Sequence, residues 1–424
     1  MSETNGKKDE DFSLYTEKIV VQPSVKYRSL INLAKILGGA CIFGIVASIV
    51  IAVVHPWMSE HFGMGRAERE SLAIMKDEYP TEEIKNTESE LDTIEGSVEA
   101  ERESLYLTSE DYGAYIKSLE TNVAMIKRSM VTVDSSHSSV DDFISGETSD
   151  TETVGIVIGQ INSEYIVMTY SEVITDEDSI VVRVSDSTEI NATLLGRNDK
   201  TGIALIGVRE GSIPAGERSM MVVANLGNSY NVKQGDMVIA AGKLYGKMGS
   251  VDYGTIASIT PASGMDNSYE LMEMGLAYKP GDFSYIFNTS GEVIGISKNR
   301  DKDTLVAIGI SDLKSMIENL SVGKGAAYVG ITGQNVTSAM ATMYGLPMGI
   351  YVSEVEMDSP AYQAGIQSGD VITAIDENMV LTIQSFSEKL YQCDNGQSIR
   401  IKAKRLGKEG YNEVEFTASV QFRN

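Results

Sequence analysis

The apolar positions of this chain follow three different patterns. Ile36–Val54 is a run of nineteen residues without a charge, long enough to cross a bilayer as a helix. From Asp111 to Arg128 apolar residues recur every three or four positions, which predicts an amphipathic helix. Beyond that helix the apolar runs are short and are separated by Gly, Asn and Asp, which predicts a series of strands.

The short apolar runs predict a mainly β region in the middle of the chain. The expected strands are Met130–Val133, Val154–Ile161, Tyr165–Met168, Ile180–Val184, Ile203–Val208, Met220–Val223, Met237–Ala241, Gly254–Ile259 and Leu305–Ile308. Many short strands at close spacing indicate a sandwich or a barrel rather than an α/β sheet. Further along, Gln384–Gln392 is expected to be a helix.

Charges on either side of the long apolar run predict its orientation. Three Lys or Arg residues lie within the ten positions before it, and none lies within the first eleven positions after it. The positive-inside rule then places the N-terminus in the cytoplasm and the bulk of the chain outside. We therefore expect a cytoplasmic tail at residues 1–30 and an uncleaved single-pass anchor in the cell membrane at residues 31–55.

Residues 56–107 are rich in Glu and Lys, and their few apolar residues are irregularly spaced. Such spacing does not build a coiled-coil seam, and Pro80 interrupts any continuous helix. We expect an acidic stalk or linker that is exposed to water.

Composition narrows the function classes. The net charge of −25 argues against nucleic acid as a partner, because a phosphate-binding surface needs clustered Lys and Arg. The two cysteines, Cys41 and Cys393, are too far apart in the predicted topology to form an intrachain disulfide. No spacing typical of metal ligands occurs, and nothing in the sequence calls for a cofactor.

Four blocks in the middle of the chain carry a resemblance. They are Tyr165–Ile174, Gly196–Val208, Asp236–Ile259 and Leu271–Ile296. In this order they resemble, in HtrA/DegP-type serine proteases, the strand that ends in the catalytic His, the segment of the catalytic Asp, a strand pair of the second barrel and the nucleophile loop. The resemblance implies a chymotrypsin-like double β-barrel over residues 108–321.

The positions that match the catalytic triad of that family hold other residues. Glu172 stands in the place of His, and Gly202 stands in the place of Asp. Phe283 takes the place of the nucleophilic Ser when the loop is aligned from its N-terminal side, and Asp282 takes it when the loop is aligned from its C-terminal side with one deletion. A serine hydroxyl needs a neighbouring imidazole as its base. The resemblance therefore points to a pseudoprotease.

Two other chemistries stay open at this site. Glu172 and Asp282 could act as paired carboxylates if burial separated their pKa values. Ser284 could support residual proteolysis. A Ser–His mechanism has little to draw on, because no histidine follows His137, which lies in a Ser-rich stretch that the resemblance places away from the cleft.

The last hundred residues carry a second resemblance. Their motifs are Tyr328-Val329-Gly330-Ile331, Ser359-Pro360-Ala361 and Gly369-Asp370-Val371-Ile372. These resemble the PDZ domain that follows the protease in the same family, which implies a PDZ domain at residues 322–424. Such a domain adds the C-terminal segment of a partner to a sheet edge and holds its carboxylate with backbone N–H groups.

The resemblance also implies which residues form the peptide groove. Tyr328, Val329, Gly330 and Ile331 make the carboxylate-binding loop, and Gly330 is expected to let the ligand backbone approach because it has no Cβ. Phe386 and Leu390 lie one turn apart on the predicted helix. They either line an apolar pocket of the groove or belong to the core.

These features lead to one main interpretation and two alternatives. In the main one, the chain is a membrane-anchored HtrA-like pseudoprotease that binds C-terminal or unfolded polypeptide segments outside the cytoplasm, in protein quality control. The first alternative is an active HtrA-type serine endopeptidase with a rearranged site. The second is a non-catalytic oligomeric scaffold, which by resemblance would be a homotrimer.

Overall fold

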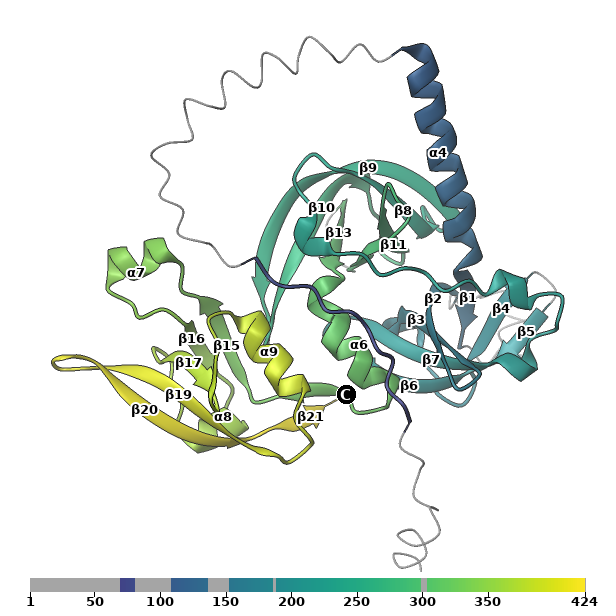
Figure 1. Ribbon diagram of the computed structural model, residues 1–424. Coiled ribbons are helices and arrows are strands. Elements are labelled where there is room, and N and C mark those ends of the chain that lie inside the picture. Colours follow the sequence, from purple (N-terminus) through teal and green to yellow (C-terminus); the bar gives the residue numbers. More distant parts are fainter. Residues whose placement is uncertain (1–68, 81–107, 136–151, 186–187, 299–302, 424) are drawn as a thin grey trace, which may run out of the picture. The chain divides into compact units, whose positions relative to one another are not determined.

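The computed structural model describes residues 69–80, 108–135, 152–185, 188–298 and 303–423 (Figure 1). The predicted tail and anchor at residues 1–55 lie outside these ranges. Within them, no helix combines the length and the apolar character that a membrane crossing needs.

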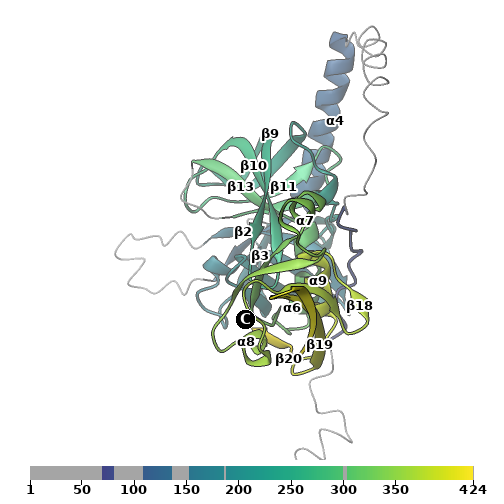
Figure 2. The same ribbon diagram turned by 90° about the vertical axis from the view of Figure 1, so that its left-hand side faces the viewer.

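Helix α4 (Ser109–Arg128) is the first helix among the residues that the structure describes. It begins after Thr108, whose hydroxyl accepts the N–H of Asp111 at 3.2 Å while the Asp111 carboxylate accepts the N–H of Thr108 at 2.9 Å. This reciprocal cap satisfies two N–H groups that a helix start leaves open. The helix predicted at Asp111–Arg128 is confirmed, and Figures 1 and 2 show it as one long, straight element.

The next strands form a seven-stranded antiparallel sheet in the order β5-β4-β1-β2-β3-β7-β6. Their bounds are β1 (Met130–Asp134), β2 (Thr153–Ile161), β3 (Glu164–Tyr170), β4 (Val181–Ser185), β5 (Thr188–Asn191), β6 (Thr193–Asn198) and β7 (Ile203–Arg209). The strands β2, β3 and β7 are almost wholly buried, as their near-continuous apolar sequences require.

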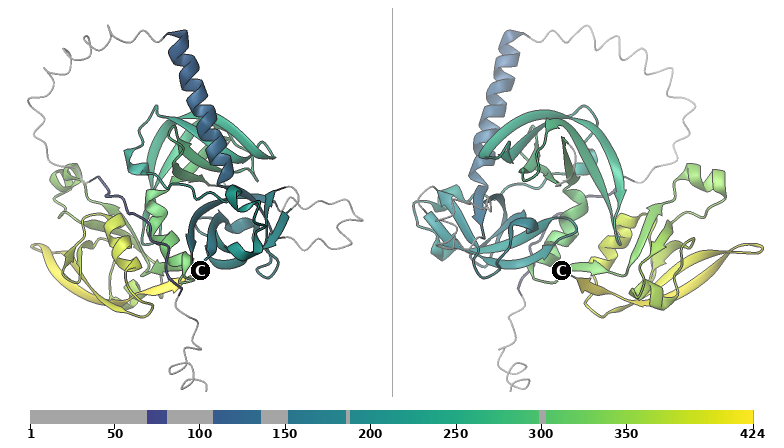
Figure 3. Two further views of the ribbon diagram at one scale, coloured as in Figure 1. Left: turned by 45° about the vertical axis from the view of Figure 1, so that its right-hand side comes forward. Right: turned by 180° about the vertical axis from the view of Figure 1, so that it is seen from behind.

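A closed barrel follows, in the strand order β10-β13-β12-β11-β8-β9. Its strands are β8 (Met237–Leu244), β9 (Lys247–Ser263), β10 (Ser268–Ala277), β11 (Phe283–Asn288), β12 (Val293–Ser297) and β13 (Thr304–Gly309). Strand β9 is 17 residues long and arches along the barrel (Figure 3). Closure leaves no free edge in this sheet, which removes a template for unwanted pairing.

Short helices connect these elements. They are η2 (Ser171–Val173), η3 (Glu210–Ser212), η4 (Arg218–Met220), η5 (Ser229–Asn231), η6 (Ser311–Leu313) and α6 (Lys314–Ser321). The strand predicted at Met220–Val223 is wrong. That segment leaves η4 without pairing into a sheet, and Met220 and Val223 are exposed by 44% and 42%. Within this run only Met221 is buried, and the segment has no strand partner.

The segment Glu70–Pro80 runs as an extended strap along α6, and most of its residues are exposed, as predicted, while a few contacts that the prediction did not include attach it to that helix. The N–H of Leu72 donates to Ser321 Oγ at 3.0 Å, and Lys314 Nζ lies 2.7 Å from Asp77 Oδ2. The Leu72 side chain is buried against Gly159, where a Cβ would come within 2.2 Å of it. Leu72 and the contacts with α6 therefore fix the segment at a few points, while most of its residues keep their contacts with solvent.

The C-terminal part is a small β domain with its own core. Its elements are β14 (Ala326–Tyr328), β15 (Ile331–Asn335), α7 (Ser338–Tyr344), β16 (Ile350–Val355), α8 (Pro360–Ala364), β17 (Val371–Ile375), β18 (Asn378–Met379), α9 (Ile383–Tyr391), β19 (Ser398–Gly407), β20 (Gly410–Ser419) and β21 (Gln421–Arg423). The main sheet has the order β15-β16-β17-β19-β20, with β18 on β17, and β14 pairs β21. Strand β15 is therefore the last strand on one side of its sheet.

Candidate functional site

Glu172 and Gly202, which the sequence resemblance aligns with the His and Asp positions of the triad, lie side by side. Glu172 sits in η2 directly after β3, and Gly202 ends the turn between β6 and β7. The N–H of Ser171 donates to the carbonyl of Gly202 at 2.9 Å, which holds the two segments together. A Cβ at Gly202 would lie 3.9 Å from Glu172 Oε1. The two aligned positions are therefore neighbours in space.

Asp282, one of the two residues that the resemblance aligns with the nucleophile, accepts one N–H group from its own turn and one from the turn between β8 and β9. Its Oδ1 accepts the N–H of Gly246 at 2.9 Å, and its Oδ2 accepts the N–H of Lys279 at 3.0 Å. The residue is 2% exposed. A carboxylate with both oxygens committed to backbone donors stabilises a loop and is poorly placed to relay protons.

Phe283, the other residue at the nucleophile position, belongs to an aromatic cluster. Its ring lies 4.5 Å from that of Tyr170, centroid to centroid, and the ring of Tyr170 lies 5.8 Å from that of Tyr285. The Tyr170 hydroxyl donates to the Ser284 carbonyl at 2.7 Å, and burial raises the pKa of Tyr170. These packed rings occupy the space next to the last residue of β3 and the first residues of β11.

Ser284 lies on β11 and is fully buried. Its Oγ has no hydrogen-bond partner among the described residues. Its N–H donates to Ser297 Oγ at 2.9 Å, and the N–H of Asp282 donates to the Lys279 carbonyl at 2.9 Å. Two N–H groups beside the nucleophile position are therefore used inside the fold. A buried hydroxyl without a neighbouring base remains a weak nucleophile.

The predicted carboxylate-binding loop does hold a carboxylate, and that carboxylate is part of the same chain. The N–H groups of Val329, Gly330 and Ile331 all point at the side chain of Asp266. The nitrogen–oxygen distances are 2.8 Å from Val329, 2.8 and 3.0 Å from Gly330, and 2.9 Å from Ile331. Asp266 comes from the turn between β9 and β10 and is 2% exposed.

The backbone next to Asp266 pairs with the outer strand of the PDZ sheet. Met265 forms an antiparallel bridge with Thr332 of β15. The N–H of Asp266 donates to the carbonyl of Ile331 at 2.7 Å. Asp266 itself has φ +57°, a left-handed conformation that Asp tolerates better than most residues and that turns the chain away after this contact.

Burial sets the charge state of Asp266. It raises the pKa of the carboxyl to about 6, because the charged form loses its water. The three N–H donors and the charge of Lys200 act in the opposite direction and keep the pKa from rising further. Near neutral pH the loop therefore holds a carboxylate anion.

Tyr328, the first residue of the loop, is held in place by two residues that lie outside the loop. Its hydroxyl donates to Glu356 Oε2, and the guanidinium of Arg423 lies 3.4 Å above its ring. Arg423 also pairs with Glu356 at 3.3 Å. Burial and the bond to Glu356 raise the pKa of Tyr328 to about 12, so that the hydroxyl stays a donor. Through this contact Arg423 of β21 packs on Tyr328, which ends β14 and begins the loop.

Gly330 has a different role from the one expected. It adopts φ +98°, and a Cβ would point at Ser359, 2.3 Å from the Cβ of that residue. The glycine is thus required by the loop's own conformation and by its contact with Ser359. The expectation that the missing Cβ makes room for a ligand backbone is corrected accordingly.

On α9 the side chains of Phe386 and Leu390 are fully buried in the core of the PDZ domain. The α9 residues that line a cavity of about 410 Å³ beside Asp266 are Ser387 and Tyr391. Sequence reasoning selected neither these two residues nor Asp266. No local pattern marks Asp266, which looks like an ordinary turn residue between two strands.

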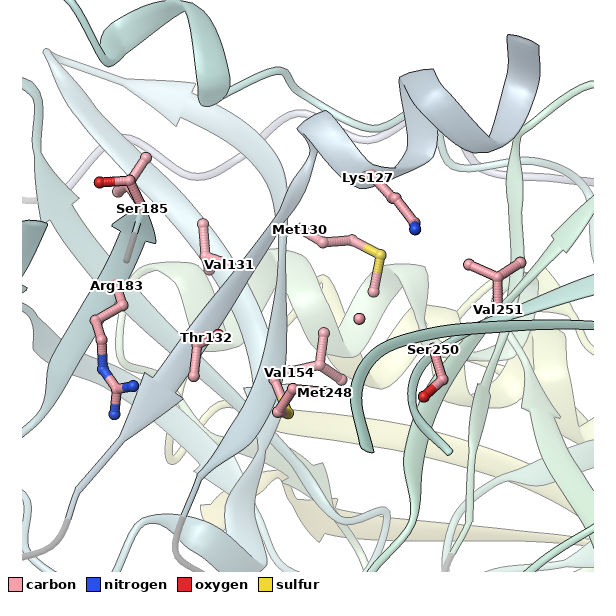
Figure 4. Close-up of a pocket in the computed structure, with 12 residues that line it drawn as sticks. Lys127, Met130, Val131, Thr132, Val154, Arg183, Ser185, Met248, Ser250 and Val251 are labelled. Atoms are coloured by element: carbon pink, nitrogen blue, oxygen red, sulfur yellow. The ribbon is translucent and has the colours of Figure 1, made fainter. Parts of the chain in front are cut away.

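A second cavity, of about 370 Å³, opens between α4, β1, β4 and β9 (Figure 4). Met130, Met248 and Val251 contribute apolar surface. Two cationic residues, Lys127 and Arg183, also line it, and Arg183 is paired with Glu152 at 2.5 Å. Elsewhere in the described ranges, no group of three His, Cys, Asp or Glu side chains is placed to hold a metal ion.

Comparisons with known proteins agree with this architecture. The sequence profile of the trypsin-like peptidase domain matches residues 153–296, and that of the PDZ domain matches residues 309–417. A "probable periplasmic serine endoprotease DegP-like" of Pseudomonas fulva is 29% identical over 232 residues, which cover 52% of this chain and 47% of the relative. One of Hahella chejuensis is 28% identical over 264 residues, covering 59% and 54%. The chain spans about half the length of these curated relatives.

Solved structures show the same fold. The HtrA-type protease AlgW with a tripeptide superposes with a TM-score of 0.53 at 21% identity, over 72% of this chain and 97% of that one. AlgW with a decapeptide gives a TM-score of 0.50 at 19% identity, over 72% and 99%. The chain therefore has an HtrA/DegP-like trypsin fold with a C-terminal PDZ domain.

Proposed function

We propose that this protein is a pseudoprotease that binds the free C-termini of other polypeptides through its PDZ domain. The observation that carries the proposal is the loop Val329–Ile331, whose three N–H groups converge on a carboxylate at 2.8 to 3.0 Å. A loop with this geometry is a carboxylate receptor, since charge-assisted bonds to backbone N–H groups are strong and directional.

The degenerate triad supports the loss of proteolysis. Glu172 and Gly202 are neighbours, so the cleft keeps its geometry without an imidazole. Phe283 packs on Tyr170, and the Ser284 hydroxyl is buried. A Ser284 hydroxyl without a hydrogen-bond partner among the described residues, next to N–H donors that are already bonded, supports a site that can neither activate a nucleophile nor stabilise the charge of acyl transfer.

The alternative of an active endopeptidase with a rearranged site has no supporting contact. Its nucleophile would be Ser284, whose Oγ lacks a hydrogen-bond partner within the described residues. Paired carboxylates are equally poorly supported, since both oxygens of Asp282 accept backbone N–H groups.

We also propose that the protein is anchored in the cell membrane with its barrel and PDZ domains outside the cytoplasm. The charge-free run Ile36–Val54 and its basic N-terminal side support this topology. The matched DegP-like relatives are themselves described as periplasmic. The resemblance also supports a role in protein quality control and a trimeric assembly. The alternative that it supports is an assembly role without peptide binding.

Peptide binding to the full-length chain in detergent micelles tests the function. The probe is a labelled ten-residue peptide that ends in three valines, compared with the same peptide carrying a C-terminal amide. We expect fluorescence anisotropy to report binding of the free acid and at least about tenfold weaker binding of the amide, because the loop donors then face a neutral group. Equal binding of both peptides would contradict carboxylate recognition.

A further inference from the structure

We propose that the turn Gly264–Asn267 is an internal ligand of the PDZ domain, so that a partner's C-terminus binds only after Asp266 has left the loop. This inference rests on the proposed function of the groove and adds a competitor to it. The competitor is a segment of the barrel, which makes peptide binding and contact with the barrel mutually exclusive.

The contacts of Asp266 reproduce, one by one, those that a terminal residue of a bound peptide requires. Its carboxylate takes the three N–H groups of Val329–Ile331. Its own N–H donates to the carbonyl of Ile331 at 2.7 Å, which is the first rung of an antiparallel ladder. The side-chain carboxylate thus stands where the main-chain carboxylate of a C-terminal residue would stand.

Met265, the residue before Asp266, also makes a contact that a bound peptide would make. Met265 bridges Thr332 in antiparallel register, so the turn adds to β15 in the direction expected of a peptide strand. In the sheet order, β15 has its partner β16 on one side and lies at the end of the sheet on the other. The turn therefore covers the edge that an added strand would use.

The contact is specific but small. One bridge and the Asp266 hydrogen bonds hold the turn against β15, whereas a bound peptide could pair along all of Ile331–Asn335. Beside Asp266 lies the cavity of about 410 Å³, with Lys200, Glu356 and Arg423 among its lining residues. This polar cavity gives a leaving carboxylate a place to be hydrated. A longer ladder can then outcompete the turn.

Competition has a measurable consequence. When a site is open for only a fraction of the time, the apparent dissociation constant equals the intrinsic value divided by that fraction. Removing the Asp266 carboxylate should therefore tighten peptide binding rather than weaken it. A residue with only a structural role in the fold would not have this effect.

The first test measures binding of the three-valine peptide to full-length wild type, Asp266→Asn and Asp266→Gly. Both substitutions suit φ +57°, so the turn is retained while the anion is lost. Asp376→Asn is the matched control, because Asp376 also has positive φ and accepts a backbone N–H, from Arg400, at another turn. We expect binding at least about tenfold tighter in both Asp266 variants and unchanged in the control.

Affinity equal to wild type in both Asp266 variants would overturn the internal ligand and leave the proposed function standing. If no form of the protein binds the free peptide, the proposed function fails. A second test, which needs no peptide, then decides whether Asp266 acts as an internal ligand.

The second test is amide hydrogen exchange of Val329–Ile331 in the same proteins. In wild type these three N–H groups are bonded to Asp266 and should be protected. In Asp266→Gly their exchange should become at least about tenfold faster, while amides of β16 and β17 keep their protection and report an intact domain. Unchanged exchange at the loop, with the domain intact, would refute the proposal.

Discussion

Asp266 and Ile331 exchange two hydrogen bonds although they are 65 positions apart in the chain. The N–H of Ile331 donates to Asp266 Oδ1 at 2.9 Å, and the N–H of Asp266 donates to the Ile331 carbonyl at 2.7 Å. This pair joins a turn of the barrel to the loop of the PDZ domain. The N–H groups of that loop are therefore bonded to a residue outside the PDZ domain.

The first prediction concerns hydrolysis. Full-length protein in micelles should neither cleave unfolded casein nor react with a fluorophosphonate probe, because Ser284 is buried and its Oγ has no hydrogen-bond partner among the described residues. Ser284→Ala should behave identically. Labelling of wild type that disappears in Ser284→Ala would instead support the rearranged protease.

Restoring the triad residues should not restore activity. The triple variant Glu172→His, Gly202→Asp and Phe283→Ser leaves the N–H of Asp282 committed to the Lys279 carbonyl. Loss of one oxyanion donor costs about 100- to 1,000-fold in rate in related chemistry. Removing the Phe283 ring also opens a cavity beside Tyr170, with a cost of about 3 to 5 kcal/mol by analogy with Phe-to-Ala changes.

Casein turnover measures the outcome, and a melting curve separates inactivity from unfolding. Phe283→Ser alone serves as the control for the cavity. Turnover by a folded triple variant above that of the single variant would show that the oxyanion pocket is still functional.

The strap should contribute to stability through one buried ion pair. Lys314 has a side chain that is 4% exposed and pairs with Asp77 at 2.7 Å. Asp77→Asn should destabilise the folded protein by about 3 to 5 kcal/mol, since the ammonium group would then be buried without its counter-ion. The matched control is Glu377→Gln, which breaks an exposed pair with Arg400 and should cost no more than about 1 kcal/mol.

Denaturant unfolding followed by circular dichroism measures both variants. A loss in Asp77→Asn no larger than that in Glu377→Gln would mean that the strap is only loosely held against α6.

Asp312 should give the fold a pH dependence. Burial, with a further contribution from the charge of Glu270, raises the pKa of its carboxyl to about 7, while the N–H of Glu270 and the Tyr230 hydroxyl bond to it and lower the pKa. Because the folded pKa exceeds the unfolded value of 3.8, the group favours folding fully at pH values below 3.8 and loses this contribution as the pH rises through 7.

Thermal midpoints between pH 5 and 8 test this sign. The decline with pH should be steeper in wild type than in Asp312→Asn, and Asp376→Asn should follow wild type because its carboxylate is at the surface. Parallel curves for wild type and Asp312→Asn would contradict the assignment.

Topology yields a last prediction. A reporter that is active only outside the cytoplasm, fused after Asn424, should be active, because the basic side of Ile36–Val54 directs the N-terminus inward. Activity of a cytoplasm-specific reporter at the same position would reverse the orientation. Substituting Lys26, Arg28 and Lys35 with Gln should lower the share of chains with the C-terminus outside the cytoplasm. This variant is the matched control.

Local patterns predicted much of the fold. The helix at Asp111–Arg128 and the apolar strands β2, β3 and β7 follow from spacing and burial within a few residues. The strand predicted at Met220–Val223 fails because apolar character alone does not supply a pairing partner. The contacts of the strap were not predicted, because its hydrogen-bonding partner Ser321 lies more than two hundred positions away from Leu72 in the chain.

The residue identities alone carry the prediction that the triad is lost, because the resemblance aligns Glu172, Gly202 and Phe283 with its positions whatever the packing. They also establish the loop Tyr328–Ile331, whose motif is local. Only the tertiary structure decides what that loop holds and which way a Cβ at Gly330 would point. The physical reason is that the partner of a backbone N–H is set by whichever distant segment folds against it, and no neighbouring residue encodes that segment.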